Sequence, residues 1–372
     1  MSANLQRMTR VAAVPALAIL LALILGAIIM IASSPLLGGF NILLPFEAYW
    51  ALLQGAFSSF DSLVNTLVDA TPLILAGLAV GIGFKAGLFN IGGQGQFLMG
   101  ALAATAVGAG LAHESPFVAA PLAILAGLAA GAVYGAIPGF LKAYTGAHEV
   151  VTTIMLNYVA LYIVAWAIVG PLHLVGATFA RSSGVGNAAL PVLIGNNGHL
   201  GILFAVIAIP AAWWLLFRST VGFEIRTVGA SPDAARYAGM RPRRLIVLTM
   251  TICGMLAGLA GAGEILGLSH FMPAAYSTNV GFDGITVALL GRSHPVGILL
   301  AGLLLGAMRA GSGLMQIQAG TPVQMVDVLQ GAILFFLTAE LLVRYIFRLR
   351  AGTIVPEEVQ TVTRSYGGQT TP

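Results

Sequence analysis

Three side-chain amides stand among glycines in the apolar stretch GLFNIGGQGQFLMGA, residues 87–101. Asn90, Gln94 and Gln96 offer hydrogen-bond donors and acceptors without charge, which suits a neutral ligand. Inside a membrane, glycine-rich backbone is tolerated only where it is buried in protein or lines a cavity. Two interpretations follow: the amides line a path for a small molecule, or Asn90 caps a helix while the glutamines bond to neighbouring helices.

A second set of polar side chains lies in HEVVTTIMLNYVALY, residues 148–162. Thr152, Thr153, Asn157 and Tyr158 fall broadly on one face of a helix, and Glu149 lies one turn before Thr153. Polar residues within a membrane are costly and usually face the interior of a helix bundle. They either line the same path or form hydrogen bonds between helices, and Glu149 is also explained as a carboxylate at a helix N-terminus.

The composition sets the medium in which these residues lie. Of 372 residues, 58% are hydrophobic and 8% are charged, whereas soluble domains carry about 25% charged residues. Lys85 and Lys142 are the only lysines. Most of the exterior must therefore face lipid, so the chain is an integral membrane protein. Its single cysteine, Cys253, excludes an intramolecular disulfide.

The apolar segments predict an all-α bundle of about ten transmembrane helices, some of them short or broken, since a helix crosses the hydrocarbon core in about 20 residues. The first segment is too long for the apolar core of a cleavable signal and is expected to be retained. The eighth is too short to cross alone, so it forms a broken or re-entrant element with the ninth, or the count falls to nine. The predicted segments are 11–32, 62–84, 91–110, 117–141, 149–170, 198–217, 244–267, 281–291, 295–312 and 322–343.

The positions of Lys and Arg orient these segments. With the N-terminus inside, the basic residues fall on the cytoplasmic side, except Arg181 outside and Arg309 within a span. Both termini are then cytoplasmic. Residues 1–345 are expected to form the membrane domain, and the polar residues 346–372 a disordered cytoplasmic tail.

Glycines recur at four-residue spacing, which allows helix backbones to approach closely in lipid. We expect most of this packing to lie within the chain and some to serve a partner subunit. The glycines are Gly127, Gly131 and Gly135; Gly254 and Gly258; and Gly302 and Gly306.

The polar segment 218–244 contains one short predicted helix. Ser231 is a good N-cap, Pro232 suits the first helical position, and Asp233 favours the positive helix end. So short a helix is not stable alone, so we expect it to dock on a cytoplasmic partner, although an incidental turn in a basic loop is the alternative. The helix continues through Ala234, Ala235, Arg236, Tyr237 and Ala238, and Gly239 ends it.

Sequence signals of catalysis are missing. No G-x-x-x-x-G-K-[ST], H-E-x-x-H or G-x-S-x-G motif occurs, and the six histidines are scattered singly. The chain therefore has no P-loop with which to hydrolyse ATP, and no enzymatic activity is expected. We expect no catalytic residue, no metal site, no cofactor and no nucleic acid polymer as partner.

Three stretches in order, GLFNIGGQGQFLMGALAA, GAHEVVTTIMLNYVALYIV and EIRTVGASPDAARYAGM, resemble the membrane permease subunits of ATP-driven (ABC) importers. The resemblance covers roughly residues 10–345 and is strongest to nucleoside-uptake permeases of the branch that handles simple sugars and nucleosides. It implies an inner-membrane importer with three partners: a cytoplasmic ATPase, a second permease that is a different but related chain, and an extracytoplasmic binding protein. It also implies that 231–239 is the coupling helix set into the ATPase, and that Asn90, Gln94, Gln96, Thr153, Asn157 and Tyr158 are candidates for the substrate path.

Alternatives remain open. Many relatives carry Glu where this chain has Gln94, and a sugar permease of the same architecture is the first alternative. An ion-coupled transporter acting alone is the second, with Glu264 or Asp327 as its coupling carboxylate. Arg309 could instead form a salt bridge with either of these acids and so stabilise the bundle. Glu340 could form an ion pair with Arg344, four residues later, at the membrane interface. Three aromatic residues of the outer loop could meet the binding protein or form an interfacial belt: Phe271, Tyr276 and Phe282.

Overall fold

The computed structural model describes residues 3–37, 39–276, 278–339, 342–343 and 346–347, with side chains from residue 15 onward except at 36 and 37. The predicted tail, 346–372, and the predicted pair of Glu340 with Arg344 lie outside the described residues apart from 346 and 347. The helices are α1 (Ala3–Ser33), α2 (Leu44–Phe57), α3 (Phe60–Lys85), α4 (Gly93–Gly110), α5 (Pro116–Phe140), α6 (Glu149–Val169), α7 (Ile202–Arg218), α8 (Thr220–Ala230), α9 (Pro232–Tyr237), α10 (Pro242–Glu264), α11 (Val280–Leu290), α12 (Pro295–Ala319) and α13 (Met325–Thr338).

The fold is all-α and membrane-spanning, as predicted, and each of the ten predicted segments contains a helix. Six described helices are long and apolar enough to cross a membrane, and a seventh span results if α7 and α8, bent by 70°, count as one. At 25 residues, α12 is a full-length span, whereas α11 has only 11 residues. Two helices were not predicted: α2 and α8.

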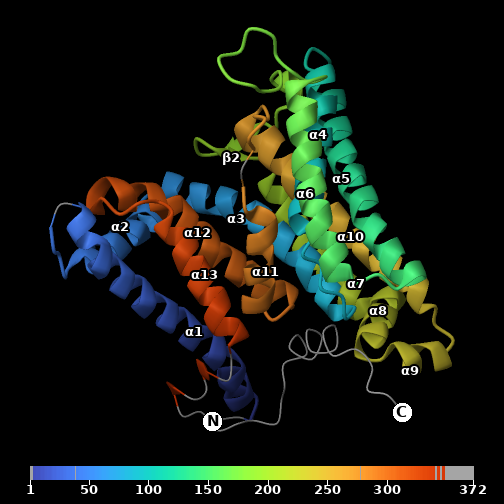
Figure 1. Cartoon of the computed structure of the whole chain (residues 1–372), viewed down its shortest axis with the longest axis horizontal. Coiled ribbons are helices and arrows are strands. Elements are labelled where there is room, and N and C mark those ends of the chain that lie inside the picture. Colours follow the sequence, from blue (N-terminus) through green and yellow to red (C-terminus); the bar gives the residue numbers. More distant parts are fainter. Residues whose placement is uncertain (1–2, 38, 277, 340–341, 344–345, 348–372) are drawn as a thin grey trace.

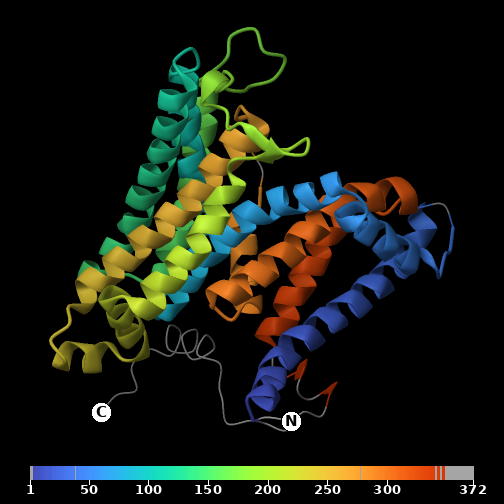
Figure 2. The ribbon, with the colours of Figure 1, turned by 180° about the vertical axis from the view of Figure 1, so that it is seen from behind.

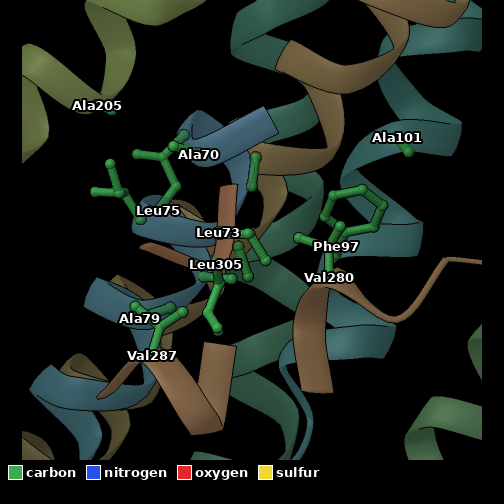
Figure 3. Close-up of a cluster of buried hydrophobic side chains, with 14 of the residues drawn as sticks. Ala70, Leu73, Leu75, Ala79, Phe97, Ala101, Ala205, Val280, Val287 and Leu305 are labelled. Atoms are coloured by element: carbon green, nitrogen blue, oxygen red, sulfur yellow. The ribbon is translucent and has the colours of Figure 1, made fainter. Parts of the chain in front are cut away.

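The helices form two groups joined through α3. Figures 1 and 2 show α4, α5, α6, α7 and α10 side by side in one group, and α1, α2, α12 and α13 in the other. Most of α3 is buried, from Val64 to Phe84, because it passes between the groups and packs on α10, α11 and α12. Figure 3 shows Leu73 of α3, Phe97 of α4 and Leu305 of α12 in this shared core.

Close helix packing confirms the role predicted for the spaced glycines. A Cβ atom on Gly131 of α5 would lie 2.2 Å from the carbonyl oxygen of Gly254 in α10. On the other side of the molecule, Gly306 of α12 meets Ala70 of α3, where a Cβ would lie 2.6 Å from the Cβ of Ala70. Within this chain the glycines therefore bring helix backbones into direct contact.

Different elements lie at the two ends of the bundle. The start of α1 and the α8–α9 segment lie at one end, and a small antiparallel hairpin lies toward the other (Figures 1 and 2). This hairpin, β1 (Val192–Ile194) with β2 (Gly198–His199), was not predicted. Two side-chain hydrogen bonds join its turn to α3: Asn196 donates to Asp61 and Asn197 to Asn65.

The short helix expected near residue 231 is present as α9. The Ser231 hydroxyl accepts a hydrogen bond from the Ala234 N–H at 3.3 Å, and Pro232 opens the helix. Gly239 has a φ of +82°, the left-handed conformation that glycine adopts without strain at a helix end. The local structure is as predicted, but the preceding residues form helix α8 rather than a loop.

Candidate functional site

A cavity of about 700 Å³ lies beside the start of α4, between α6 and the segment that leads into α11. Its polar lining consists of amides and hydroxyls, and its wall is apolar and aromatic. No Asp, Glu, Lys or Arg occurs among the described residues around it. They are Ile91, Gln94, Leu98, Ile154, Asn157, Tyr158, Leu161, Tyr162, Ala165, Ala274, Ala275, Tyr276, Thr278, Asn279 and Phe282.

Gln94 lines this cavity and joins two distant parts of the chain. Its amide nitrogen donates to the Thr278 carbonyl oxygen, and its amide oxygen accepts from the Gly281 N–H at 2.9 Å. The approach is close because a Cβ on Gly281 would lie 2.2 Å from the Gln94 backbone nitrogen. Gln94 thus holds the N-terminus of α11 against the N-terminus of α4.

Asn157 also lines the cavity and supports the start of α4 from the side of α6. Its amide oxygen accepts from the Gly95 N–H at 2.8 Å, and its amide nitrogen donates to the Ile91 carbonyl at 3.0 Å. These bonds satisfy backbone groups of the glycine-rich segment that lack partners within a helix. Asn157 thus lowers the cost of placing this segment beside a cavity at membrane depth.

Asn90 and Gln96 do not line the cavity. Their side-chain amides bond to each other in both directions, at 3.0 and 3.2 Å, and the Asn90 oxygen also accepts from the Gly92 N–H. Both side chains are 1% exposed. Thr153 is also buried, and its hydroxyl donates to the Glu149 carbonyl of the preceding turn. The structure thus separates the six candidates: Gln94, Asn157 and Tyr158 border the cavity, and the other three are buried beside it.

The sequence predicted some of the aromatic residues in the cavity wall and missed others. Tyr158 and the unpredicted Tyr162 follow each other by one turn on α6, so the helical repeat could have revealed the second. Tyr276 and Phe282, assigned from sequence to the outer loop, both border the cavity, and Tyr276 stacks on Phe97 with centroids 6.4 Å apart. Thr278 and Asn279 were missed because no periodic pattern marks a connecting segment.

The short helix α9 contributes to a hydrophobic cluster that is separate from the main core. Ala235 of α9 packs with Ala86 and Leu88, in the turn between α3 and the glycine-rich segment. The two buried residues that α8 contributes to this cluster are Ile225 and Val228. Since Leu88 lies two residues before Asn90, the cluster connects α9 with the Asn90–Gln96 amide pair and, through α4, with Gln94.

The charged residues of the bundle pair differently from the two pairs considered from sequence. Arg309 of α12 forms its salt bridge with Asp283 of α11, not with Asp327 or Glu264. Asp283 follows Phe282 of the cavity wall, and its position beside Arg309 depends on how α11 packs, which sequence spacing does not reveal.

At the start of α6, the Glu149 carboxylate lies 2.7 Å from the Lys142 ammonium group. It is the first residue of the helix, as expected of a carboxylate at a helix N-terminus. Among the described residues, no three His, Cys, Asp or Glu side chains come together as a metal site would require.

Comparison with known proteins places the chain in a family. Residues 62–338 match the model of the permease component of branched-chain amino acid transport systems. The chain is 39% identical over 339 residues to the guanosine ABC transporter permease protein NupP of Bacillus subtilis, covering 90% of this chain and 94% of NupP. It is 35% identical to the nucleoside ABC transporter permease protein NupB of Lactococcus lactis, covering 90% and 93% of the two chains. It is also 35% identical to the glucose ABC transporter permease protein TsgB13 of Haloferax volcanii, covering 89% and 88%. No solved structure matches the chain.

Proposed function

The chain belongs to the permease component family of branched-chain amino acid transport systems, and on this premise we propose that it is the membrane subunit of an ATP-driven nucleoside importer. The observation that carries the proposal is the uncharged lining of the 700 Å³ cavity. A zwitterionic amino acid requires charged partners when it leaves water. A neutral nucleoside requires amides and hydroxyls for its polar edges and an aromatic wall for its base.

The nucleoside assignment is also supported by the named cargoes of two relatives, guanosine in one and nucleosides in the other. A sugar permease is the second candidate, because a third relative is named for glucose. The aromatic side chains of the cavity favour a base over a sugar alone: Tyr158, Tyr162, Tyr276 and Phe282 form four of its fifteen described residues.

Energy for transport would come from a partner ATPase, since the sequence has no P-loop. The chain itself would use no cofactor.

Helix α9, formed by residues 231–239 with its N-cap and its terminating glycine, would dock in a cleft of that ATPase. Its movement would reach Leu88 through the hydrophobic cluster and then Gln94 through the start of α4. Gln94 would transmit it to α11, so both walls of the cavity would move together.

Orientation follows from charge. With the α9 end of the bundle in the cytoplasm, Lys85, Lys142 and the arginines of α8–α10 face the side that favours positive charge. Both termini are then cytoplasmic in a bacterial inner membrane. The opposite end, with the β1–β2 hairpin, faces the extracytoplasmic binding protein that would deliver the nucleoside.

A second permease would cover the exposed face of α6. Tyr158, Tyr162 and Trp166 follow one another by one turn and are 57%, 70% and 69% exposed. The cavity opens beside the two tyrosines, and polar groups such as Gln94 and Asn157 cannot face hydrocarbon at low cost. A related chain packed on this face would close the cavity and separate the cargo from lipid.

The test is import by the purified complex of permeases and ATPase in proteoliposomes, with the cognate binding protein outside. We expect ATP-dependent uptake of labelled guanosine or another nucleoside, with little uptake of glucose or leucine. Preferred uptake of glucose would replace the nucleoside assignment with the sugar assignment. Uptake of nucleoside by the permease alone, without ATPase, would contradict the ATP-driven mechanism and favour ion coupling.

A further inference from the structure

A second, smaller cavity of about 210 Å³ lies below the β1–β2 hairpin, among α3, α12 and the π-helical turn Ile265–Ser269 that follows α10. It is lined by an acidic side chain, a basic side chain and two amides, and by a small apolar surface. Its described residues are Asn65, Val68, Asp69, Asn197, Leu268, Arg309 and Ala310. None of them borders the larger cavity. The hairpin lies away from α9, at the opposite end of the bundle (Figure 2).

The polar groups of this cavity have unused hydrogen-bonding capacity. Neither carboxylate oxygen of Asp69 accepts a hydrogen bond from the described part of the chain. Arg309 bonds to Asp283 through Nη2, so Nε and Nη1 have no acceptor among the described residues. The Asn197 amide nitrogen donates to the Asn65 amide oxygen at 3.1 Å, which leaves the amide nitrogen of Asn65 and the amide oxygen of Asn197 without a bond to the described part of the chain. If nitrogen and oxygen are exchanged in both amides, one amide nitrogen and one amide oxygen of the pair still remain available to a ligand.

This combination fits hydroxyl groups in particular. A hydroxyl both donates and accepts, so neighbouring hydroxyls can donate to Asp69 and Asn197 while they accept from Arg309 and Asn65. A free cation would meet the Arg309 guanidinium. A carboxylate would meet Asp69, and it could not use the Arg309 charge fully because Asp283 already neutralises it. A neutral ring with several hydroxyls satisfies all four side chains without adding charge.

We propose that this outer cavity binds the polyhydroxylated sugar ring of the cargo before the cargo reaches the larger cavity. The inference rests on the proposed function and deepens it, since a nucleoside consists of a base and a pentose. The small apolar surface of Val68, Leu268 and Ala310 suits the C–H face of such a ring. Under the proposed orientation the cavity lies on the side of the binding protein, where the cargo enters.

The experiment measures direct binding to the assembled permease–ATPase complex in nanodiscs, without binding protein or nucleotide. Saturation-transfer NMR is recorded with D-ribose, adenine and L-leucine as separate probes. We expect saturation of the ribose ring protons, and about tenfold weaker ribose binding in Asp69→Asn, because a charge-assisted hydrogen bond to a hydroxyl is lost. Adenine binding should not change, because the base would occupy the other cavity.

Asp61→Asn is the matched control. It makes the same chemical change on the same helix but lies outside the cavity, where Asp61 accepts a bond from Asn196, and ribose binding should remain at the level of the unmodified complex. Ala310→Leu is a second variant, which fills the cavity and should also weaken ribose binding. Unchanged ribose binding in folded Asp69→Asn and Ala310→Leu would overturn the inference, as would saturation of leucine in place of ribose.

The experiments distinguish failure of the proposed sugar site from failure of the proposed nucleoside import. If the complex imports nucleosides but shows no ribose binding that depends on Asp69, the outer cavity is not a sugar site and the proposed function stands. If ribose binding depends on Asp69 while the complex imports glucose and no nucleoside, the outer site stands and the nucleoside assignment fails.

Discussion

At the scale of single residues, three similar amides in one motif have different surroundings. Asn90 and Gln96 satisfy each other in a buried pair, whereas Gln94 borders the cavity and bonds across to α11. The sequence suggested either residues that line a path or residues that form structural hydrogen bonds. Gln94 fits the first interpretation, and Asn90 and Gln96 fit the second. The bond from Gly281 to Gln94 joins residues 187 positions apart, so no local pattern could have distinguished Gln94 from its neighbours.

Replacing Gln94 with leucine should reduce uptake by about tenfold or more while the complex still assembles. The side chain keeps its bulk, but the Gly281 N–H and the Thr278 carbonyl lose their partner, and an unpaired buried group costs about 1–3 kcal/mol. Initial rates of ATP-dependent uptake in proteoliposomes measure the effect. The same substitution at exposed Gln318 in α12 is the control. Normal uptake by Gln94→Leu would mean that Gln94 is not part of the transport path.

We expect His199 of β2 to make the hairpin less stable in acid. Burial, and secondly the nearby charge of His270, lower the pKa of His199 below its ordinary value, and its Nδ1 accepts a hydrogen bond from the Gly201 N–H. The unfolded hairpin therefore binds more protons than the folded one at acid pH. Stability is complete above the ordinary histidine pKa of about 6.5 and should fall as the pH drops below it.

Hydrogen exchange of the hairpin amides, corrected for intrinsic rates, measures this loss between pH 7.5 and pH 5.5 (pH values chosen to bracket about 6.5). His199→Asn retains a side-chain acceptor without a titratable ring, so it should remove most of the pH dependence. Greater protection at the lower pH would contradict the assignment.

At the scale of elements, the helix pairs depend on glycine at their crossing points. Gly131→Ala should destabilise the protein by about 1–3 kcal/mol, because the added methyl group overlaps the Gly254 carbonyl and forces α5 away from α10. Gly313→Ala in α12 is the matched control, since a Cβ there meets nothing within 4 Å. Thermal unfolding of the two variants in detergent gives the comparison, and equal midpoints would show that the crossing tolerates more separation than the structure indicates.

Helix α9 presents exposed side chains, and the described ion pair of Arg236 is with Asp233 of the same helix, at 3.7 Å. Tyr237 is 95% exposed, and Tyr and Arg are enriched among the few residues that each contribute about 2 kcal/mol or more to a protein interface. Tyr237→Ala, and Arg236→Ala beside it, should reduce copurification of the ATPase by roughly tenfold or more. Arg181→Ala, at the other end of the bundle, serves as control. Retention of the ATPase and of transport by both α9 variants would remove the docking role.

At the scale of the whole molecule, the exposed α6 face predicts how the permease pair assembles. Tyr162→Cys should react with a maleimide when the chain is purified alone and be protected in the complete complex, since the second permease would cover it. Cys253, the only native cysteine, is fully buried and should give little background. Mass spectrometry of the labelled chain measures the change.

Val133→Cys is the control for this experiment, because Val133 of α5 is 66% exposed and lies away from the cavity lining. It should label equally in both preparations. Equal labelling of Tyr162→Cys would mean that α6 faces lipid in the complex as well.

The sequence by itself determined the properties that depend on local composition and spacing. Lack of charge identified a membrane protein, apolar length identified ten helical segments, and Ser231, Pro232 and Gly239 marked the ends of α9. Each of these signals involves residues within a few turns of one another. Helix α8 escaped notice because it lies in a polar segment, where no apolar span marks it.

Only the tertiary structure decided which of the candidate residues meet. It separated Gln94, Asn157 and Tyr158, at the cavity, from Asn90, Gln96 and Thr153, which are buried beside it. It paired Arg309 with Asp283, and it placed Asp69 with Asn197 in a second cavity. The physical reason is that each of these contacts forms between different elements, whose mutual positions depend on how whole helices pack and not on the spacing along any one of them.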